Sequence, residues 1–113
     1  MIKIFHNNRC SKSRCGVEIL ENSGKDFEII NYLQTPPNKE ELKDIIKLLG
    51  IAPIELVRKN EQIWKDAYKD KNLSDDEVIE AMIENPKLIE RPIVINGKKA
   101  VIGRPPETIK EII

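Results

Sequence analysis

The chain has 113 residues, 40% of them hydrophobic, which fits one domain with a modest core. Lysine plus arginine and aspartate plus glutamate both number 19, so the formal net charge is zero. A protein that binds nucleic acid through its overall charge normally has a basic excess, so we do not expect that class. The sequence has no apolar run long enough to span a membrane, and we expect no secretory signal. Two cysteines in such a chain favour free or catalytic thiols in a reducing compartment, so we expect a cytoplasmic protein.

The first third is expected to form a strand, a helix and a second strand. The alternating residues 2–5 are typical of a strand, and a helix is expected from Ser11 to Ser23, with Gly24 ending it. A second β-prone run covers residues 27–32. The joining segment is just long enough for a parallel, right-handed crossover.

The middle of the chain is expected to be helical. Asn38 is a candidate N-cap of a helix that carries an apolar stripe and ends at Gly50. Shorter helices are expected at about 53–57 and 64–69, with Trp64 as a core residue of this region. A capping box at residues 74–77 predicts a further helix, which ends at Asn85 and Pro86.

The last third is expected to return to β structure. Strands are expected at 92–95 and 100–102, joined by Asn96 and Gly97, and a final helix at 105–113. The whole pattern predicts an α/β thioredoxin-like fold with a four-stranded mixed sheet. We expect a single domain over 1–113, with a core of about 1–34 and 89–113 and a helical insertion at 35–88.

Cys10 lies between the first strand and the first helix. The unpaired N–H groups and positive dipole end of a helix lower the pKa of a thiol there, and the thiolate is the reactive form. Ser13 and Arg14 add a hydrogen-bonding and cationic neighbourhood. The alternative is a small buried residue at a strand end, which the polar loop disfavours.

Cys15 is a weaker candidate. Position 13, where the partner in a Cys-x-x-Cys motif would lie, is Ser13. Along a helix Cys15 rises about 7.5 Å from Cys10, beyond comfortable disulfide reach. We expect a core-side residue, with a resolving thiol as the alternative. A mechanism that uses one thiol then needs a thiol from outside the chain.

Several segments resemble the arsenate reductase (ArsC) family of glutaredoxin-linked enzymes, whose relatives include the Spx regulators. The active-site loop of that family resembles His6–Arg14. Similarity continues, in order and over nearly the whole chain, at residues 32–37, 57–61, 90–94 and 103–105.

The resemblance implies a role for several residues. It implies that Cys10 is the nucleophile and that Arg58, Arg91 and Arg104 bind the oxyanion. It also implies that His6 corresponds to the family's histidine at the start of the active-site loop. Pro92 corresponds to the proline that thioredoxin folds hold in cis beside the catalytic cysteine. Guanidinium groups suit this task because they bind the oxygens of an oxyanion bidentately.

The implied reaction reduces arsenate, or a similar oxyanion, with glutathione as co-substrate and glutaredoxin as partner. One histidine and two poorly placed cysteines do not make a usual zinc set, so we expect no bound metal or cofactor.

Other interpretations remain open. Arg58 could cap a helix, Arg91 and Arg104 could be charges at strand edges, and His6 could be a loop-packing residue. Asn8 replaces the proline common in the family, and the Spx regulators often carry cysteine at position 13. The alternative functions are an Spx-like regulatory or partner-binding protein without turnover and a thiol oxidoreductase with another substrate.

Overall fold

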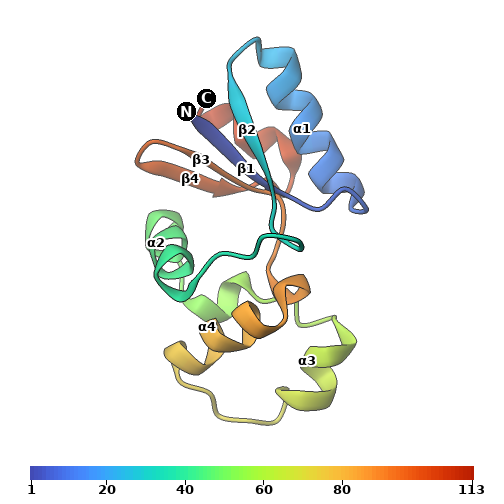
Figure 1. Ribbon diagram of the computed structural model, residues 1–113, viewed down its shortest axis with the longest axis vertical. Coiled ribbons are helices and arrows are strands. Elements are labelled where there is room, and N and C mark those ends of the chain that lie inside the picture. The colour runs from blue at the N-terminus through green and yellow to red at the C-terminus, as the bar shows by residue number, and fades with distance from the viewer. The chain divides into compact units, whose positions relative to one another are not determined.

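The computed structural model describes residues 1–113 and divides into two compact units. The sheet unit comprises Met1–Thr35 and Arg91–Ile113, and the inserted unit comprises Pro36–Glu90. Each unit is described by itself. The two ends of the chain therefore build one unit together, which brings residues far apart in sequence into the same structure (Figure 1).

The sheet unit contains a four-stranded mixed sheet with the strand order β2-β1-β3-β4. Its strands are β1 (Ile2–His6), β2 (Phe27–Asn31), β3 (Ile93–Asn96) and β4 (Lys99–Ile102). Strand β1 pairs in parallel with β2 and antiparallel with β3, and β3 pairs antiparallel with β4. The β3–β4 turn contains Gly97 at φ 62°, a conformation that glycine adopts without steric cost.

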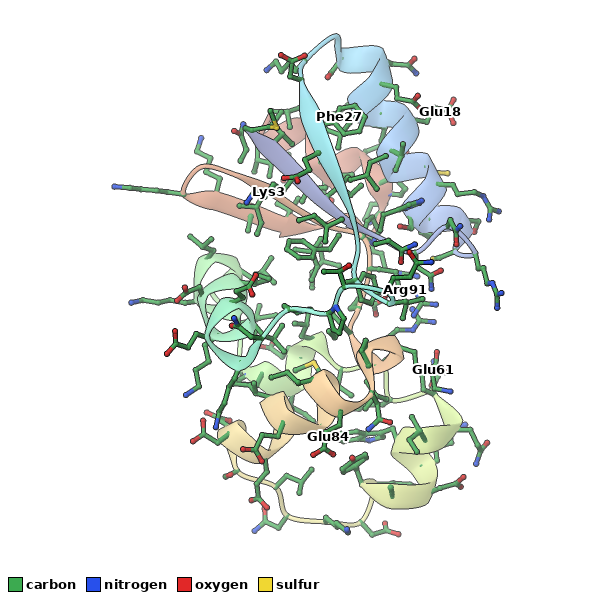
Figure 2. The ribbon with its side chains drawn as sticks, in the orientation of Figure 1. Lys3, Glu18, Phe27, Glu61, Glu84 and Arg91 are labelled. Atoms are coloured by element: carbon green, nitrogen blue, oxygen red, sulfur yellow. The ribbon has the colours of Figure 1, made fainter.

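Helix α1 (Ser11–Ser23) and the 3-10 helix η3 (Pro106–Glu111) pack together against this sheet (Figure 1). Their shared core consists of buried aliphatic side chains: Ile2, Ile4, Leu20, Val94 and Ile109. Phe27 packs against this cluster from β2 (Figure 2). Burying each such side chain stabilises the fold by about 1.5–3 kcal/mol.

The final helix is shorter than predicted and of a different type. Its hydrogen bonds join residues three apart, as from Thr108 N–H to the Pro105 carbonyl at 3.0 Å. The Thr108 hydroxyl also donates to that carbonyl and to the Ile102 carbonyl. Two adjacent prolines supply no N–H donors, and these side-chain bonds favour the tighter turn.

The regular elements of the inserted unit are all helices, and one isolated β-bridge joins Val57 to Ile89. Its elements are α2 (Lys39–Leu49), η1 (Pro53–Leu56), α3 (Gln62–Ala67), α4 (Asp75–Glu84) and η2 (Pro86–Leu88). The predicted capping boxes are present at the starts of α2 and α4. Trp64 is 6% exposed, so its prediction as a core residue is confirmed.

These observations confirm the predicted α/β thioredoxin-like fold with a helical insertion. None of the helices combines the length and the apolar character that crossing a membrane requires.

Candidate active site

Cys10 is the N-cap residue of α1, directly after the loop that leaves β1. Its backbone is extended, at φ −97° and ψ 123°, and its carbonyl accepts the first helical bond from Arg14 N–H at 3.0 Å. The first turn of α1 contains no acidic residue. The half-buried Cys10 side chain therefore lies at the positive end of a helix without a competing negative charge.

Several groups around Cys10 stabilise its thiolate form. Partial burial raises the pKa of the thiol, but this effect is outweighed by the Ser13 backbone N–H, the Arg91 guanidinium and the Lys12 backbone N–H. The net pKa of Cys10 is therefore lowered from its ordinary value. Because the thiolate is the nucleophile, this site favours attack by sulfur.

Arg91 precedes β3 and Arg104 follows β4, so the two arginines lie beside each other at the same end of this strand pair. Arg104 Nε donates to the Arg91 carbonyl at 2.8 Å, and Arg104 Nη2 lies 3.5 Å from Cys10 Sγ. Figure 2 labels Arg91, whose segment leads into β3. The antiparallel register explains this proximity, because Ile93 pairs with Ile102 and the chain leaves both strands at the same end.

The peptide bond between Arg91 and Pro92 is cis, as the resemblance implied. Pro92 is buried, and its carbonyl accepts a hydrogen bond from Gly103 N–H at 2.7 Å. A second cis bond, between Arg104 and Pro105, was not predicted. Both arginines thus directly precede a proline on the Cys10 side of the sheet unit.

A buried hydrogen-bond group connects the active-site loop to α1. Ser13 Oγ lies 2.6 Å from His6 Nδ1 and accepts a bond from the Asn7 backbone N–H at 3.0 Å. Burial lowers the pKa of His6, a bond with Ser13 raises it and the charge of Arg14 lowers it, so the net shift is downward. His6 is therefore neutral at neutral pH and orients the loop through a hydrogen bond, without a charge.

The exposed Arg14 side chain acts on the loop backbone. Its Nη1 donates to the Asn8 carbonyl at 3.0 Å. Together with the contact from Asn7 Oδ1 to the Arg9 backbone N–H at 3.0 Å, this bond holds the loop before Cys10. Sequence reasoning overlooked Asn7, although an asparagine shortly before a helix is a recognised signal for such a turn.

The prediction that Cys15 faces the core is wrong. Cys15 is exposed and free, whereas the buried residues of α1 are Ser13, Gly16 and Leu20. The face defined by these three residues points away from position 15 at the helical spacing of 3.6 residues per turn.

Arg58 belongs to the inserted unit and is held there by two carboxylates. Its Nη1 lies 2.8 Å from Glu90 Oε1, and its Nε lies 3.6 Å from Glu61 Oε1. The Val57–Ile89 bridge explains the ion pair between Arg58 and Glu90. The backbone N–H of Arg58 donates to the Leu88 carbonyl at 2.7 Å and aligns the two segments. The side chain of Arg58 is 22% exposed.

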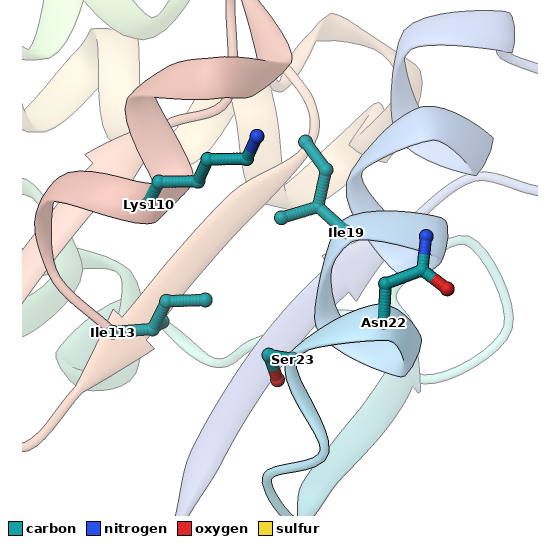
Figure 3. A pocket seen from close by; sticks show the side chains of 5 residues that line it. All are labelled: Ile19, Asn22, Ser23, Lys110 and Ile113. Carbon is teal, nitrogen blue, oxygen red and sulfur yellow. The ribbon is translucent and has the colours of Figure 1, made fainter.

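A cavity of about 360 Å³ lies between α1 and η3, away from Cys10. It is lined by Ile19, Asn22, Ser23, Lys110 and Ile113 (Figure 3). Asn22 and Ser23 are at the C-terminal end of α1, and a helix of 13 residues is about 20 Å long. This cavity is therefore separate from the thiol chemistry.

Within the sheet unit, the geometry combines a stabilised thiolate with two guanidinium groups. Arginine recognises tetrahedral oxyanions through paired N–H donors, and a nearby thiolate is a soft nucleophile. This combination can hold an oxyanion next to sulfur and promote formation of a covalent bond between them.

Comparisons with known proteins match this chain to one family over nearly its whole length. A family model described as the ArsC family matches residues 5–112. An arsenate reductase from Neisseria meningitidis serogroup B is 44% identical, with 99% of this chain and 97% of that protein covered. The uncharacterized protein YfgD from Escherichia coli K12 is 46% identical, with 99% of this chain and 96% of that protein covered.

A solved structure is similar over the same length. The arsenate reductase from Vibrio cholerae has a TM-score of 0.94 and 45% identity, with 99% of this chain and 97% of that chain covered. The resemblance inferred from the active-site loop and the later motifs is thus confirmed, and the chain belongs to the ArsC family.

Proposed function

We propose that this protein reduces arsenate to arsenite with a thiol as the source of electrons. The observation that carries the proposal is the placement of Arg91 and Arg104 at the sulfur of Cys10, whose pKa is lowered. The arsenate reductases of similar sequence and structure support the choice of oxyanion.

In the first step, Arg91 and Arg104 bind the arsenate oxygens and the Cys10 thiolate attacks arsenic. A sulfur–arsenic bond forms, and one arsenate oxygen leaves as hydroxide or water. The guanidinium groups neutralise the charge that builds up on the remaining oxygens. Ser13 and His6 hold the loop in place.

In the second step, a glutathione thiolate attacks the sulfur of Cys10. A disulfide forms between Cys10 and glutathione, the sulfur–arsenic bond breaks, and its electron pair stays on arsenic, which becomes trivalent. Arsenite then leaves. Glutaredoxin reduces the mixed disulfide by thiol exchange and regenerates the Cys10 thiolate. This cycle needs free thiols, so we place it in the cytoplasm.

We include Arg58 as a third oxyanion ligand on the resemblance alone. Its two carboxylate partners already neutralise part of its charge. It therefore has less net attraction to offer an anion than Arg91 or Arg104.

The test is arsenite production with glutathione and glutaredoxin, measured for the wild type, Cys10→Ser and Cys15→Ser. We expect turnover by the wild type and by Cys15→Ser, and none by Cys10→Ser. No turnover by the wild type would refute arsenate as the substrate. Equal loss in both cysteine variants would refute the single-thiol mechanism.

A further inference from the structure

A second cavity in the sheet unit adjoins the active-site loop. It has a volume of about 280 Å³ and is lined by Asn8, Arg9, Asn31, Leu33 and Gln34. The parallel pairing of β1 with β2 explains its position, because His6 pairs with Asn31 and both strands end at the same edge of the sheet. The loop before α1 and the segment after β2 therefore enclose it.

The lining of this cavity presents hydrogen-bond donors. Arg9 contributes an exposed guanidinium group, and Asn8 and Gln34 contribute exposed amides. The side-chain amide oxygen of Asn31, Oδ1, is buried and has no hydrogen-bond partner. The group that Asn31 can offer to the cavity is therefore its NH₂ group.

The buried oxygen of Asn31 is costly for folding. A buried acceptor without a partner destabilises the folded state by about 1–3 kcal/mol. The main-chain carbonyl of Asn31 already accepts bonds from Gln34 and Thr35 at 3.1 and 2.9 Å, so the turn does not need the side chain. The side chain of Asn31 is therefore available to the cavity, to which it can offer its NH₂ group.

The cavity adjoins the residue that precedes the reactive cysteine. Arg9 directly precedes Cys10, and Cys10 N–H bonds to the Asn7 carbonyl at 3.0 Å, which folds the loop into a tight turn. Consecutive Cα atoms are about 3.8 Å apart. A ligand of tripeptide length bound beside Arg9 can therefore place a thiol at Cys10.

The charge of the lining distinguishes this cavity from the oxyanion site. Arg9 is its one cation, and the amides around it are neutral. One guanidinium group with neutral donors matches a single carboxylate, whereas arsenate, with more charge, is better matched by the two arginines at Cys10.

We propose that this cavity binds one terminal carboxylate of the thiol co-substrate, a peptide thiol of the glutathione class. The inference rests on the proposed function, because it assigns a place to the reductant of that reaction. It identifies Arg9, Asn31 and Gln34 as residues that recognise the co-substrate, separate from those that bind the oxyanion.

The test needs no arsenate. In a Cys15→Ser background, Cys10 is allowed to form a mixed disulfide with glutathione disulfide or with the neutral bis(2-hydroxyethyl) disulfide, and mass spectrometry follows both rates. In each reaction the Cys10 thiolate attacks one sulfur and a thiolate leaves. We expect the wild type to prefer glutathione disulfide by at least about tenfold, the value of one charge-assisted hydrogen bond.

Arg9→Gln, Asn31→Leu and Gln34→Leu are expected to reduce this preference while the rate with the neutral disulfide is retained. Asn31→Leu and Gln34→Leu change no charge, so they separate contact in the cavity from long-range attraction. The matched control is Lys98→Gln, an exposed cation in the β3–β4 turn, which is expected to keep the wild-type preference.

A wild type without preference, or variants that all retain it, would overturn the inference. The same measurement is informative if the wild type fails to produce arsenite. A preference that depends on Arg9 and Asn31 would then support the thiol site, although the proposed substrate would be refuted.

Discussion

At the scale of single residues, the chemistry depends on how a few polar groups surround one sulfur. Burial alone would make Cys10 a poorer nucleophile, because it raises the pKa of the thiol. The Ser13 backbone N–H and Arg91 reverse that effect. Neighbouring residues contribute mainly through main-chain donors, so the positions of Lys12 and Ser13 matter more than their side-chain charge.

Arg91→Gln is expected to raise the pKa of Cys10, since a guanidinium group near a thiolate favours the charged form. The measurement is the pH dependence of Cys10 alkylation by iodoacetamide, which follows the thiolate fraction. Because the wild-type pKa is lowered, the wild type reacts at lower pH than the variant. Lys98→Gln, which removes an exposed cation in the β3–β4 turn, is the control. Coincident profiles for wild type and Arg91→Gln would contradict the assignment.

At the scale of elements, the sheet unit depends on close packing behind the active site. A Cβ added to Gly103 would lie 2.8 Å from Pro92 Cγ and 3.0 Å from Ile109 Cδ1. The proline ring has little freedom to move. Gly103 therefore allows β4 and η3 to approach the segment that carries Arg91.

Gly103→Ala is expected to destabilise the fold by about 1–3 kcal/mol, the usual cost of overpacking a core. It is also expected to lower activity, because the residue next to Gly103 is Arg104. Urea unfolding measures the first effect and arsenite production the second. An unchanged midpoint would show that the neighbouring side chains rearrange freely.

Many of the helices and strands could be predicted from the sequence, because the residues that begin and end them act locally. Gly24 and Gly50 end helices, and Asn38 and Ser74 begin them, through contacts within a few residues. The exposure of Cys15 and the type of the last helix could not be predicted in this way. They depend on which face of α1 meets the sheet and on the bonds of Thr108.

The candidate site was only partly predictable for the same reason. The loop motif indicated Cys10, and the resemblance indicated Arg91 and Arg104. The cavity at Asn31 was missed because it is formed by two loops that meet only when β1 and β2 pair.

At the scale of the whole molecule, a chain with no net charge still places two arginines beside one sulfur. Cys10 and Arg104 are 94 residues apart in sequence, yet they meet because both ends of the chain build the sheet unit. The inserted unit has its own core and its own arginine, Arg58. The role of Arg58 in the reaction is inferred from the family resemblance alone.

Arg58→Gln is expected to lower kcat/KM for arsenate by about 10²-fold, a typical effect of removing one ligand of a reacting oxyanion. Glu90→Gln is the matched variant, since it removes the same 2.8 Å ion pair but keeps the guanidinium group. Both variants are expected to lose similar stability in urea unfolding, and only Arg58→Gln to lose activity. Equal activity in the two variants would remove Arg58 from the proposed site.

The most direct test of the central claim is protection of Cys10 by arsenate. The wild type is alkylated with iodoacetamide in arsenate or in chloride at equal ionic strength, and peptide mass spectrometry follows Cys10 and Cys15 separately. We predict that arsenate slows the reaction of Cys10, leaves that of Cys15 unchanged and has little effect in Arg91→Gln. Equal alkylation of Cys10 in arsenate and in chloride would contradict it.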